Sequence, residues 1–348
     1  PLSEEEWRSL RRNVTQHSES YSQTYSFTGN GELFDLPAGP VAFAGVLEVG
    51  KQGYRIRPDS QYNDGSLYNV SKASSSGGSR DRYAAGGEFS IPLHDTLLVS
   101  AAGRWDQYRF SGRTEEQTTY NLGLEWRPLT SLLLRGSYGT SFRAPTFNEL
   151  YYPGYGLATN KPEQGRNAEV GLRYDDGVSK LSASYYHNKV SDLLVNTSPC
   201  PDPLFTGYGC AYNVNKALLE GLTIAGARKF GAFNVSGNID LQDPRDETKD
   251  KQLVRRAKQH ANFAVDYTAG ALTSGAEWQL SGKRFDDAAN KNVLGGYGLV
   301  NLYATYQFTH DWSVLARWNN IANKDYELAR FYATPGSKVF VGVRYGMK

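Results

Sequence analysis

The chain has 348 residues, of which 39% are hydrophobic and 13% aromatic, and it contains 24 Tyr and 36 Gly. This length suffices for one large or two ordinary domains, and a net charge of +2 with scattered basic residues gives no indication of a nucleic-acid partner. No window approaches 18 consecutive apolar residues, which excludes a transmembrane helix. A membrane barrel is not excluded, because its strands alternate and never form a long apolar run.

Apolar and polar residues alternate with a period of two in one segment after another. In TTYNLGLEWRPL, Leu122 and Leu124 share one parity while Glu125 and Arg127 share the other, and KVFVGVRYG repeats the pattern. The alternation predicts fifteen strands, at residues 20–36, 38–57, 80–93, 95–110, 115–127, 130–143, 165–176, 178–195, 210–229, 230–243, 256–269, 270–284, 294–308, 311–325 and 336–346.

The connections between these strands alternate between short and long along the chain. The longer set comprises residues 57–80, 110–115, 143–165, 195–210, 243–256, 284–294 and 325–336. An up-and-down barrel in an outer membrane has tight periplasmic turns and long extracellular loops, whereas a soluble β-sandwich has no reason for this alternation. The all-β chain is therefore predicted to form an antiparallel up-and-down transmembrane β-barrel. Its apolar face meets lipid, and its polar face, with Glu125, Arg173, Glu277 and Lys283, lines the lumen.

The run TSFRAPTFNELYYP (140–153) concentrates aromatic residues where a strand gives way to a long connection. Phe142 has the lipid-facing parity, so we assign it to an interfacial aromatic girdle. Tyr151, Tyr152 and Tyr155 lie beyond the membrane, where aromatic rings have no lipid to face. Because binding residues concentrate on loops held by a rigid scaffold, we expect these tyrosines to face a ligand or to pack the loop over it.

Five segments in order resemble the TonB-dependent outer-membrane receptors, and the likeness spans roughly residues 130–346. They are SYGTSFRAPTFNELY, NKPEQGRNAEVGLRY, NVNKALLEGLTIAGARKF, LVRRAKQHANFAVDY and NNIANKDYELARFYATPGSKVFVGVRY. RRAKQ and the overall spacing are most similar to the cobalamin and siderophore receptor group.

The resemblance implies a barrel of about 22 strands preceded by a plug domain, of which this chain would be the C-terminal part. The chain starts at Pro1 and its only Met is Met347, which agrees with a piece of a longer protein. We expect residues 1–348 to form one barrel domain that is incompletely closed. Residues 1–19 would be the remnant of an extracellular loop, with the plug domain absent.

By the same resemblance, the leading functional hypothesis is high-affinity uptake of a large, scarce nutrient, cobalamin or a ferric siderophore, across the outer membrane of a Gram-negative bacterium. The expected partners are membrane lipid, the nutrient and the TonB complex, which would act through the missing plug. A passive porin is the alternative, because porins have 16–18 strands, close to the number predicted. A barrel enzyme ranks last.

The candidate ligand-binding residues are placed on the long connections. They are Asn148, Tyr151, Tyr152, Tyr155, Phe205, Tyr208, Phe331 and Tyr332. Cys200 and Cys210, the only cysteines, share one connection outside the cell, where oxidising conditions favour a disulfide. The bridge would present Phe205 and Tyr208 at the outer mouth.

Neither a cofactor, a metal site nor a catalytic residue is predicted. The five histidines form no readable triad with a nucleophile. The acidic residues Asp243, Asp246, Glu247 and Asp250 could bind Ca²⁺ through oxygen ligands. Their spacing is not that of an EF-hand and they alternate with Lys and Arg, which favours a solvated loop.

Overall fold

The alternating segments form long antiparallel strands in a computed structural model, which describes residues 3–68, 72–203 and 209–346. All fifteen predicted strands are present. They are β1 (Gln16–Leu36), β2 (Gly39–Pro58), β3 (Ser76–His94), β4 (Leu97–Phe110), β5 (Arg113–Leu129), β6 (Leu132–Arg143), β7 (Glu163–Asp175), β8 (Ser179–Thr197), β9 (Cys210–Phe230), β10 (Phe233–Asp246), β12 (Gln259–Ala269), β13 (Leu272–Ser281), β16 (Tyr297–Gln307), β17 (Trp312–Asn319) and β18 (Lys338–Tyr345).

The described residues also form three short strands and three short helices. β11 (Lys251–Gln252) pairs with β10, while β14 (Arg284–Phe285) and β15 (Val293–Leu294) form a separate two-stranded ladder. The helices are α1 (Glu4–Leu10), α2 (Phe147–Tyr151) and the 3₁₀ turn η1 (Ser60–Tyr62), and both α-helices start with a capping box. Within the described part of the chain, no helix has the length and apolarity needed to span a membrane.

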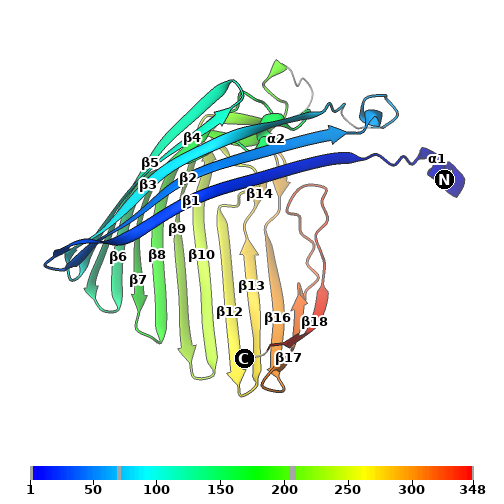
Figure 1. The fold of residues 1–348 in the computed structure, drawn as a ribbon. Helices are drawn as coiled ribbons and strands as arrows, with labels where there is room; N and C mark the ends of the chain where they lie inside the picture. The colour runs from blue at the N-terminus through cyan, green and yellow to red at the C-terminus, as the bar shows by residue number, and fades with distance from the viewer. Residues whose placement is uncertain (1–2, 69–71, 204–208, 347–348) are drawn as a thin grey trace.

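The strands follow their order in the chain in one strongly curved sheet of 16 strands (Figure 1). Among the described residues, β1 pairs only with β2 and β18 only with β17, so the first and last strands do not meet. The prediction of an incompletely closed barrel is confirmed. Both edges leave backbone N–H and C=O groups without a ladder partner, which is unfavourable wherever water is absent.

The two ends of the sheet differ in their connections. At the end we call the turn end, strands join through tight turns such as residues 37–38, 95–96 and 231–232. At the opposite end, the loop end, most connections are long, and residues 144–162 and 320–337 are examples. The β4–β5 connection is an exception, which corrects the predicted loop at 110–115. Gly112, with φ of +87°, allows a tight hairpin there, and Phe110 already pairs with Arg113.

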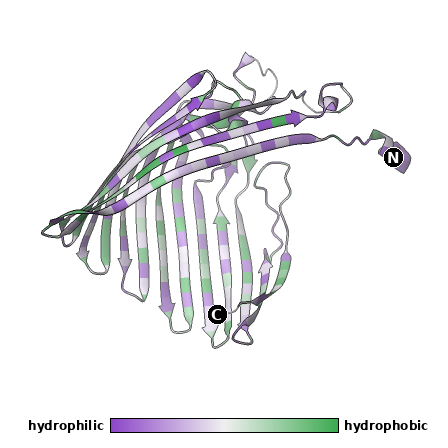
Figure 2. Cartoon of the chain, in the orientation of Figure 1, coloured by the Kyte–Doolittle hydropathy of each residue, from purple (hydrophilic) through white to green (hydrophobic). Residues whose placement is uncertain are grey.

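Side chains alternate between a concave inner face and a convex outer face, as the banding of hydropathy along each strand shows (Figure 2). Glu125, Arg173 and Glu277 line a hollow on the inner face, as predicted. Leu124 lies on the outer face with 46% of its surface exposed. Lys283 is a correction, because β13 ends at Ser281 and Lys283 lies exposed beyond the sheet.

The N-terminal boundary also differs from the prediction. β1 begins at Gln16 and pairs with β2 from its first residue, Gln16 with Pro58. Residues 16–19 therefore belong to the sheet, and the segment before it is correspondingly shorter than the predicted 1–19.

Candidate ligand-binding site

Four charged side chains of β2, β3 and β4 form an ion network on the inner face. Arg82 lies 3.1 Å from both Glu48 and Asp106, and Arg104 lies 2.8 Å from Asp106 and also contacts Glu48. Asp106 is buried. Two cations and two anions compensate one another, so this network forms a rigid, polar part of the inner surface.

Arg80 lies next to this network, nearer the loop end. Its guanidinium carbon is 5.0 Å from the ring centre of Tyr108 and 5.1 Å from that of Phe147, within cation–π range. It donates hydrogen bonds to Gln52 and to the carbonyl of Pro145, each 2.8 Å long. No carboxylate among the described residues forms an ion pair with Arg80, so its charge remains available for an anionic group.

Helix α2 extends from β6 across the inner face of β2 and β3. Phe147 stacks on Tyr54 of β2 at 6.3 Å and on Tyr151 at 6.1 Å between ring centres. Tyr151 lies against Gly78 of β3, where an added Cβ would stand 2.5 Å from the ring. Only a glycine at position 78 permits this close approach. Thr146 and Glu149 supply the capping box that starts the helix.

Phe142 is not a girdle residue, which corrects the assignment made from its parity. The ladder between β5 and β6 ends at Asn121 and Gly139, so β6 has no partner on that side further along. Phe142 fills the resulting space and contacts Tyr108 with ring centres 6.1 Å apart. By its position in the alternation of β6, Phe142 would face outward. Because β5 and β6 separate beyond Gly139, its side chain packs inward against Tyr108 instead.

The second half of the 144–162 connection is docked on β9. Asn160 has 3% of its surface exposed, and its amide nitrogen donates to the carbonyls of Glu149 at 2.8 Å and Ala211 at 3.0 Å. Ala211 donates its own N–H to the carbonyl of Tyr155 at 2.9 Å. The predicted disulfide between Cys200 and Cys210 is present, and Leu157 packs against it.

Arg143, the last residue of β6, joins both ends of this connection. It forms ion pairs with Glu149 at 2.9 Å and with Glu163 at 2.7 Å. Burial opposes ionisation of Glu149, but the hydrogen bonds from Arg143 and the Thr146 N–H outweigh it and lower the pKa of this carboxyl. Burial, with the nearby charge of Glu149, raises the pKa of the Tyr155 hydroxyl.

The predicted ligand residues fall into two groups. Asn148, Tyr151, Tyr152 and Tyr155 lie together on the docked connection, with Asn148 and Tyr152 exposed and the other two partly buried.

Phe331 and Tyr332 lie on the separate 320–337 connection and are 84% and 71% exposed, without a ring contact to the first group among the described residues. Phe205 and Tyr208 lie outside the described residues.

Two residues of the site were not predicted from the sequence. Arg80 stands in a Ser- and Gly-rich segment whose pattern carries no functional signal. Phe147 belongs to the aromatic run, and the Thr146–Glu149 spacing of a capping box could have revealed the helix that positions it.

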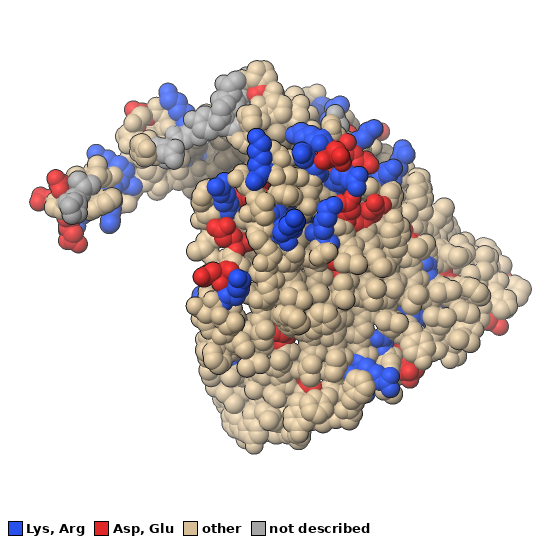
Figure 3. Space-filling view, turned by 180° about the vertical axis from the view of Figure 1, so that it is seen from behind, with Lys and Arg blue, Asp and Glu red and all other residues tan. Residues whose placement is uncertain are grey.

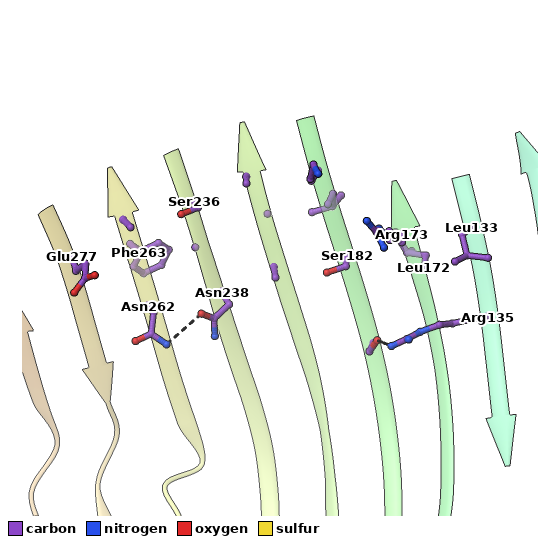
Figure 4. Close-up of a pocket in the computed structure, with 18 of the residues that line it drawn as sticks. Leu133, Arg135, Leu172, Arg173, Ser182, Ser236, Asn238, Asn262, Phe263 and Glu277 are labelled. Atoms are coloured by element: carbon purple, nitrogen blue, oxygen red, sulfur yellow. Dashed lines mark hydrogen bonds between the residues drawn. The ribbon is translucent and has the colours of Figure 1, made fainter. Parts of the chain in front are cut away.

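We call the opening at the loop end, with α2, Arg80 and the 144–162 connection, the mouth. Toward the turn end from the mouth, the inner face encloses a hollow of about 950 Å³ (Figure 4). Its polar lining carries both signs of charge, with Glu125, Arg135 and Arg173 on one side and Glu277 on the other. Asn262 of β12 donates to Asn238 of the neighbouring strand β10 at 3.2 Å. Arg135 donates to Ser184 at 3.2 Å. A surface of this kind suits a hydrated or polar occupant.

The acidic residues near the end of β10 lie among basic side chains. Asp243 is paired with Lys258 at 2.6 Å and with Arg245, so its charge is already compensated within the protein. No group of three or more His, Cys, Asp or Glu side chains among the described residues is arranged to hold a metal ion.

Comparison with known proteins identifies the fold and the family. A family model described as "TonB dependent receptor-like, beta-barrel" matches residues 3–321. The chain belongs to this family. The two features that the sequence predicted, long loops at one end and an open sheet, are thus those of part of a TonB-dependent receptor barrel.

The chain is similar to two proteins named vitamin B12 transporter BtuB. The protein of Photobacterium profundum is 32% identical over 250 residues, which cover 68% of this chain and 40% of that protein. The protein of Vibrio vulnificus is 30% identical over 238 residues, 66% of this chain and 37% of that protein. The aligned part of this receptor barrel therefore covers about 40% of each of these relatives, and the chain spans only part of their length.

Solved structures share the fold at low sequence identity. The copper transporter OprC superimposes with a TM-score of 0.79 at 16% identity, over 95% of this chain and 57% of that one. The siderophore receptor PiuA from Acinetobacter baumannii superimposes with a TM-score of 0.74 at 18% identity, over 95% and 56%. The family model and the two vitamin B12 transporters favour a receptor barrel over the passive porin that the sequence left as the alternative.

Proposed function

We propose that the protein containing this receptor barrel takes up a large, scarce nutrient, and that this nutrient is cobalamin. The observation that carries the proposal is the 32% identity to a vitamin B12 transporter over two thirds of this chain. A ferric siderophore is the second candidate, because several solved receptors of the same fold are siderophore receptors.

The mouth has the groups that such a ligand requires. Tyr151 and Tyr152 offer aromatic surface on a connection held in place by Asn160 and the disulfide, so little conformational entropy is lost on binding. Arg80 supplies a cation without a carboxylate partner among the described residues for an anionic group, such as the phosphate of cobalamin. Phe331 and Tyr332 are exposed on the second connection and would close over a bulky ligand.

The proposed location is the outer membrane of a Gram-negative bacterium, with the loop end outside the cell. The proposed energy source is the TonB complex, which would act through a plug domain in the part of the protein that this chain does not span. In this scheme the nutrient passes through the hollow on the inner face, and the mixed charges of its lining keep the hollow hydrated. We assign no catalytic step to any residue.

Binding to the full-length protein tests the ligand. Cyanocobalamin and ferric enterobactin are titrated separately into the purified receptor by isothermal titration calorimetry. Saturable binding of cyanocobalamin alone supports cobalamin, and binding of the ferric siderophore alone transfers the proposal to siderophores. If neither binds, both are wrong.

Matched variants test the mouth. Tyr151→Ala and Arg80→Gln should each weaken ligand binding about tenfold or more, since each removes about 1.4 kcal/mol or more of contact. Tyr174→Ala, at the turn end, is the control for loss of a tyrosine and should bind as the parent does. Equal weakening by all three variants contradicts a site at the loop end.

Energy dependence separates a receptor from a porin. Uptake of radiolabelled cobalamin by cells carrying the full-length protein should stop when the proton gradient is dissipated. Uptake that continues unchanged indicates a passive pore.

A further inference from the structure

A buried arginine lies at the loop end, in the β14–β15 hairpin. Arg284 starts β14, pairs with Leu294 of β15 and has only 4% of its surface exposed. Its guanidinium carbon is 5.4 Å from the ring centre of Tyr297, and its Nη2 donates to the backbone carbonyl of Glu327 at 2.5 Å. Leu294 is also buried, and Tyr297 packs on Tyr326 with ring centres 4.5 Å apart. The guanidinium therefore has apolar and aromatic neighbours, where the effective dielectric constant is low.

The other terminal nitrogen of this side chain, Nη1, is buried without a hydrogen-bond acceptor. It is the only such side-chain atom in the part of the chain that the structure describes. No described carboxylate forms an ion pair with Arg284, whereas Arg255 on the preceding connection has one. A guanidinium stays protonated in proteins, so Arg284 is buried with its full charge. Burying a charge without compensation is strongly unfavourable.

The carboxylates of the β14–β15 hairpin, and that of the residue bound at Nη2, are engaged elsewhere. Asp286 pairs with Arg255 at 2.6 Å. Asp287 accepts three backbone N–H groups of its own turn. The carboxylate of Glu327 accepts the backbone N–H of Phe331 at 3.3 Å. None of the three is therefore left to compensate the buried guanidinium.

Other cations near the loop end have a counter-ion or contact with water. Figure 3 shows Lys and Arg side chains near this end at the surface, among Asp and Glu side chains. Arg80 lacks a described carboxylate partner too, but it is only partly buried, so water reaches its charge. A buried water molecule beside Arg284 would accept a hydrogen bond from Nη1, yet a neutral molecule leaves the charge uncompensated. Charge balance therefore requires an anion at this position.

We propose that Arg284 binds a small inorganic anion, chloride, at Nη1. Because Nη1 is enclosed by its neighbours, a single ion suits this position better than the charged group of a large molecule. The anion would stabilise the guanidinium in the place where it binds the Glu327 carbonyl. It would thereby hold the 320–337 connection, with the exposed Phe331 and Tyr332, on the β14–β15 hairpin. The proposal goes beyond nutrient uptake and does not depend on which nutrient the protein takes up.

Hydrogen exchange of the full-length receptor in detergent tests this site. Sodium chloride is titrated against sodium gluconate at constant ionic strength, and exchange is followed in residues 326–332. An anion that binds only the closed arrangement slows exchange through opening by one plus the ratio of its concentration to its dissociation constant. We therefore expect a saturable effect on binding, with exchange about elevenfold slower at a chloride concentration of about ten times the dissociation constant.

Two matched variants separate the site from a general effect of salt. Arg284→Met removes the charge and the donors but keeps a flexible, unbranched side chain, so exchange should become equal in chloride and gluconate. Arg256→Met is the control, because Arg256 is exposed on the connection before β12 and forms no ion pair with a described residue. Both variants lose one positive charge, but the control should keep the chloride dependence of the parent.

Crystals of the unaltered full-length receptor grown in sodium bromide give a second measurement that depends on no variant. Bromide replaces chloride and is located by its anomalous scattering. We expect an anomalous peak within contact distance of Nη1 of Arg284, and no such peak in crystals grown in gluconate.

Several outcomes overturn the proposal. Slowing that does not saturate, or that is equal in all three proteins, shows a general effect of salt. Chloride dependence that persists in Arg284→Met places the anion elsewhere. A water molecule at Nη1 in place of bromide, or a carboxylate from the part of the protein that this chain does not span, shows that no inorganic anion binds there.

Discussion

The outer face in the middle of the sheet and the mouth at the loop end are built from the same strands but hold their side chains differently. Leu124 and Val170 project from the outer face with about half of their surface exposed. At the mouth, Asn160 and Leu157 are buried, and the amide of Asn160 has specific backbone partners. The stability of the outer face therefore depends on the medium around it, whereas the stability of the mouth depends on contacts within the chain.

This difference predicts which substitutions act through the medium. Leu124→Arg should destabilise the full-length protein in lipid vesicles by about 2–4 kcal/mol, the cost of Arg near the middle of a bilayer. Glu125→Gln, one residue away on the inner face, should cost less than about 1 kcal/mol, because it removes only an exposed pair with Arg127. Urea titrations measure both. Equal destabilisation would contradict the assignment of faces.

Reduction of the disulfide should affect the mouth and leave the outer face unchanged. In the chain-entropy model a ring of this size contributes about 2.5–3 kcal/mol to local order. Because Leu157 packs on the bridge, hydrogen exchange in residues 144–162 should accelerate and ligand binding should weaken in Cys200→Ser/Cys210→Ser. The urea midpoint of the barrel should stay the same. A lowered midpoint would mean that the bridge supports the sheet.

A smaller effect is expected from the buried amide that joins the connection to β9. Asn160→Ala leaves the carbonyls of Glu149 and Ala211 without this donor and should cost about 1–3 kcal/mol in the opening of this connection. Asn148→Ala, on the same connection but exposed, is the control and should have little effect. Hydrogen exchange of the Ala211 amide measures both variants, and similar protection in both would exclude the proposed role of Asn160.

The smallest effect is a pH dependence confined to the mouth. The folded-state pKa of Glu149 is lowered from its usual value of 4.5, so its contribution to stability is present above pH 4.5 and is lost as the pH falls through the lowered value. Residues 144–162 should open faster at pH 3 than at pH 6 after correction for intrinsic exchange. Glu149→Gln should remove that difference. A difference that persists in this variant would point to another carboxylate.

The structure agrees with the sequence most closely where the pattern is periodic. The fifteen strands and the outward position of Leu124 follow from an alternation of period two, because a strand places successive side chains on opposite faces. The disulfide also follows, since Cys200 and Cys210 are the only cysteines and share one connection.

Other features were missed or misassigned because periodicity does not encode them. β14 and β15 have two residues each, too short for any alternation to appear. The 110–115 connection was predicted to be long, but Gly112 permits a tight turn. Helix α2 had a readable capping box, yet five residues are too few for a helical period.

The sequence by itself determined the fifteen long strands, the two faces and the end at which the long connections gather, because each depends on local alternation and turn chemistry. Only the tertiary structure decided that Phe142 turns inward, that Arg80 stands between Tyr108 and Phe147, and that Asn160 bridges to Ala211. It also brought Arg166 opposite Lys189. These contacts join residues far apart in the chain, and strand register, which sets them, depends on the pairing of whole strands rather than on any short stretch.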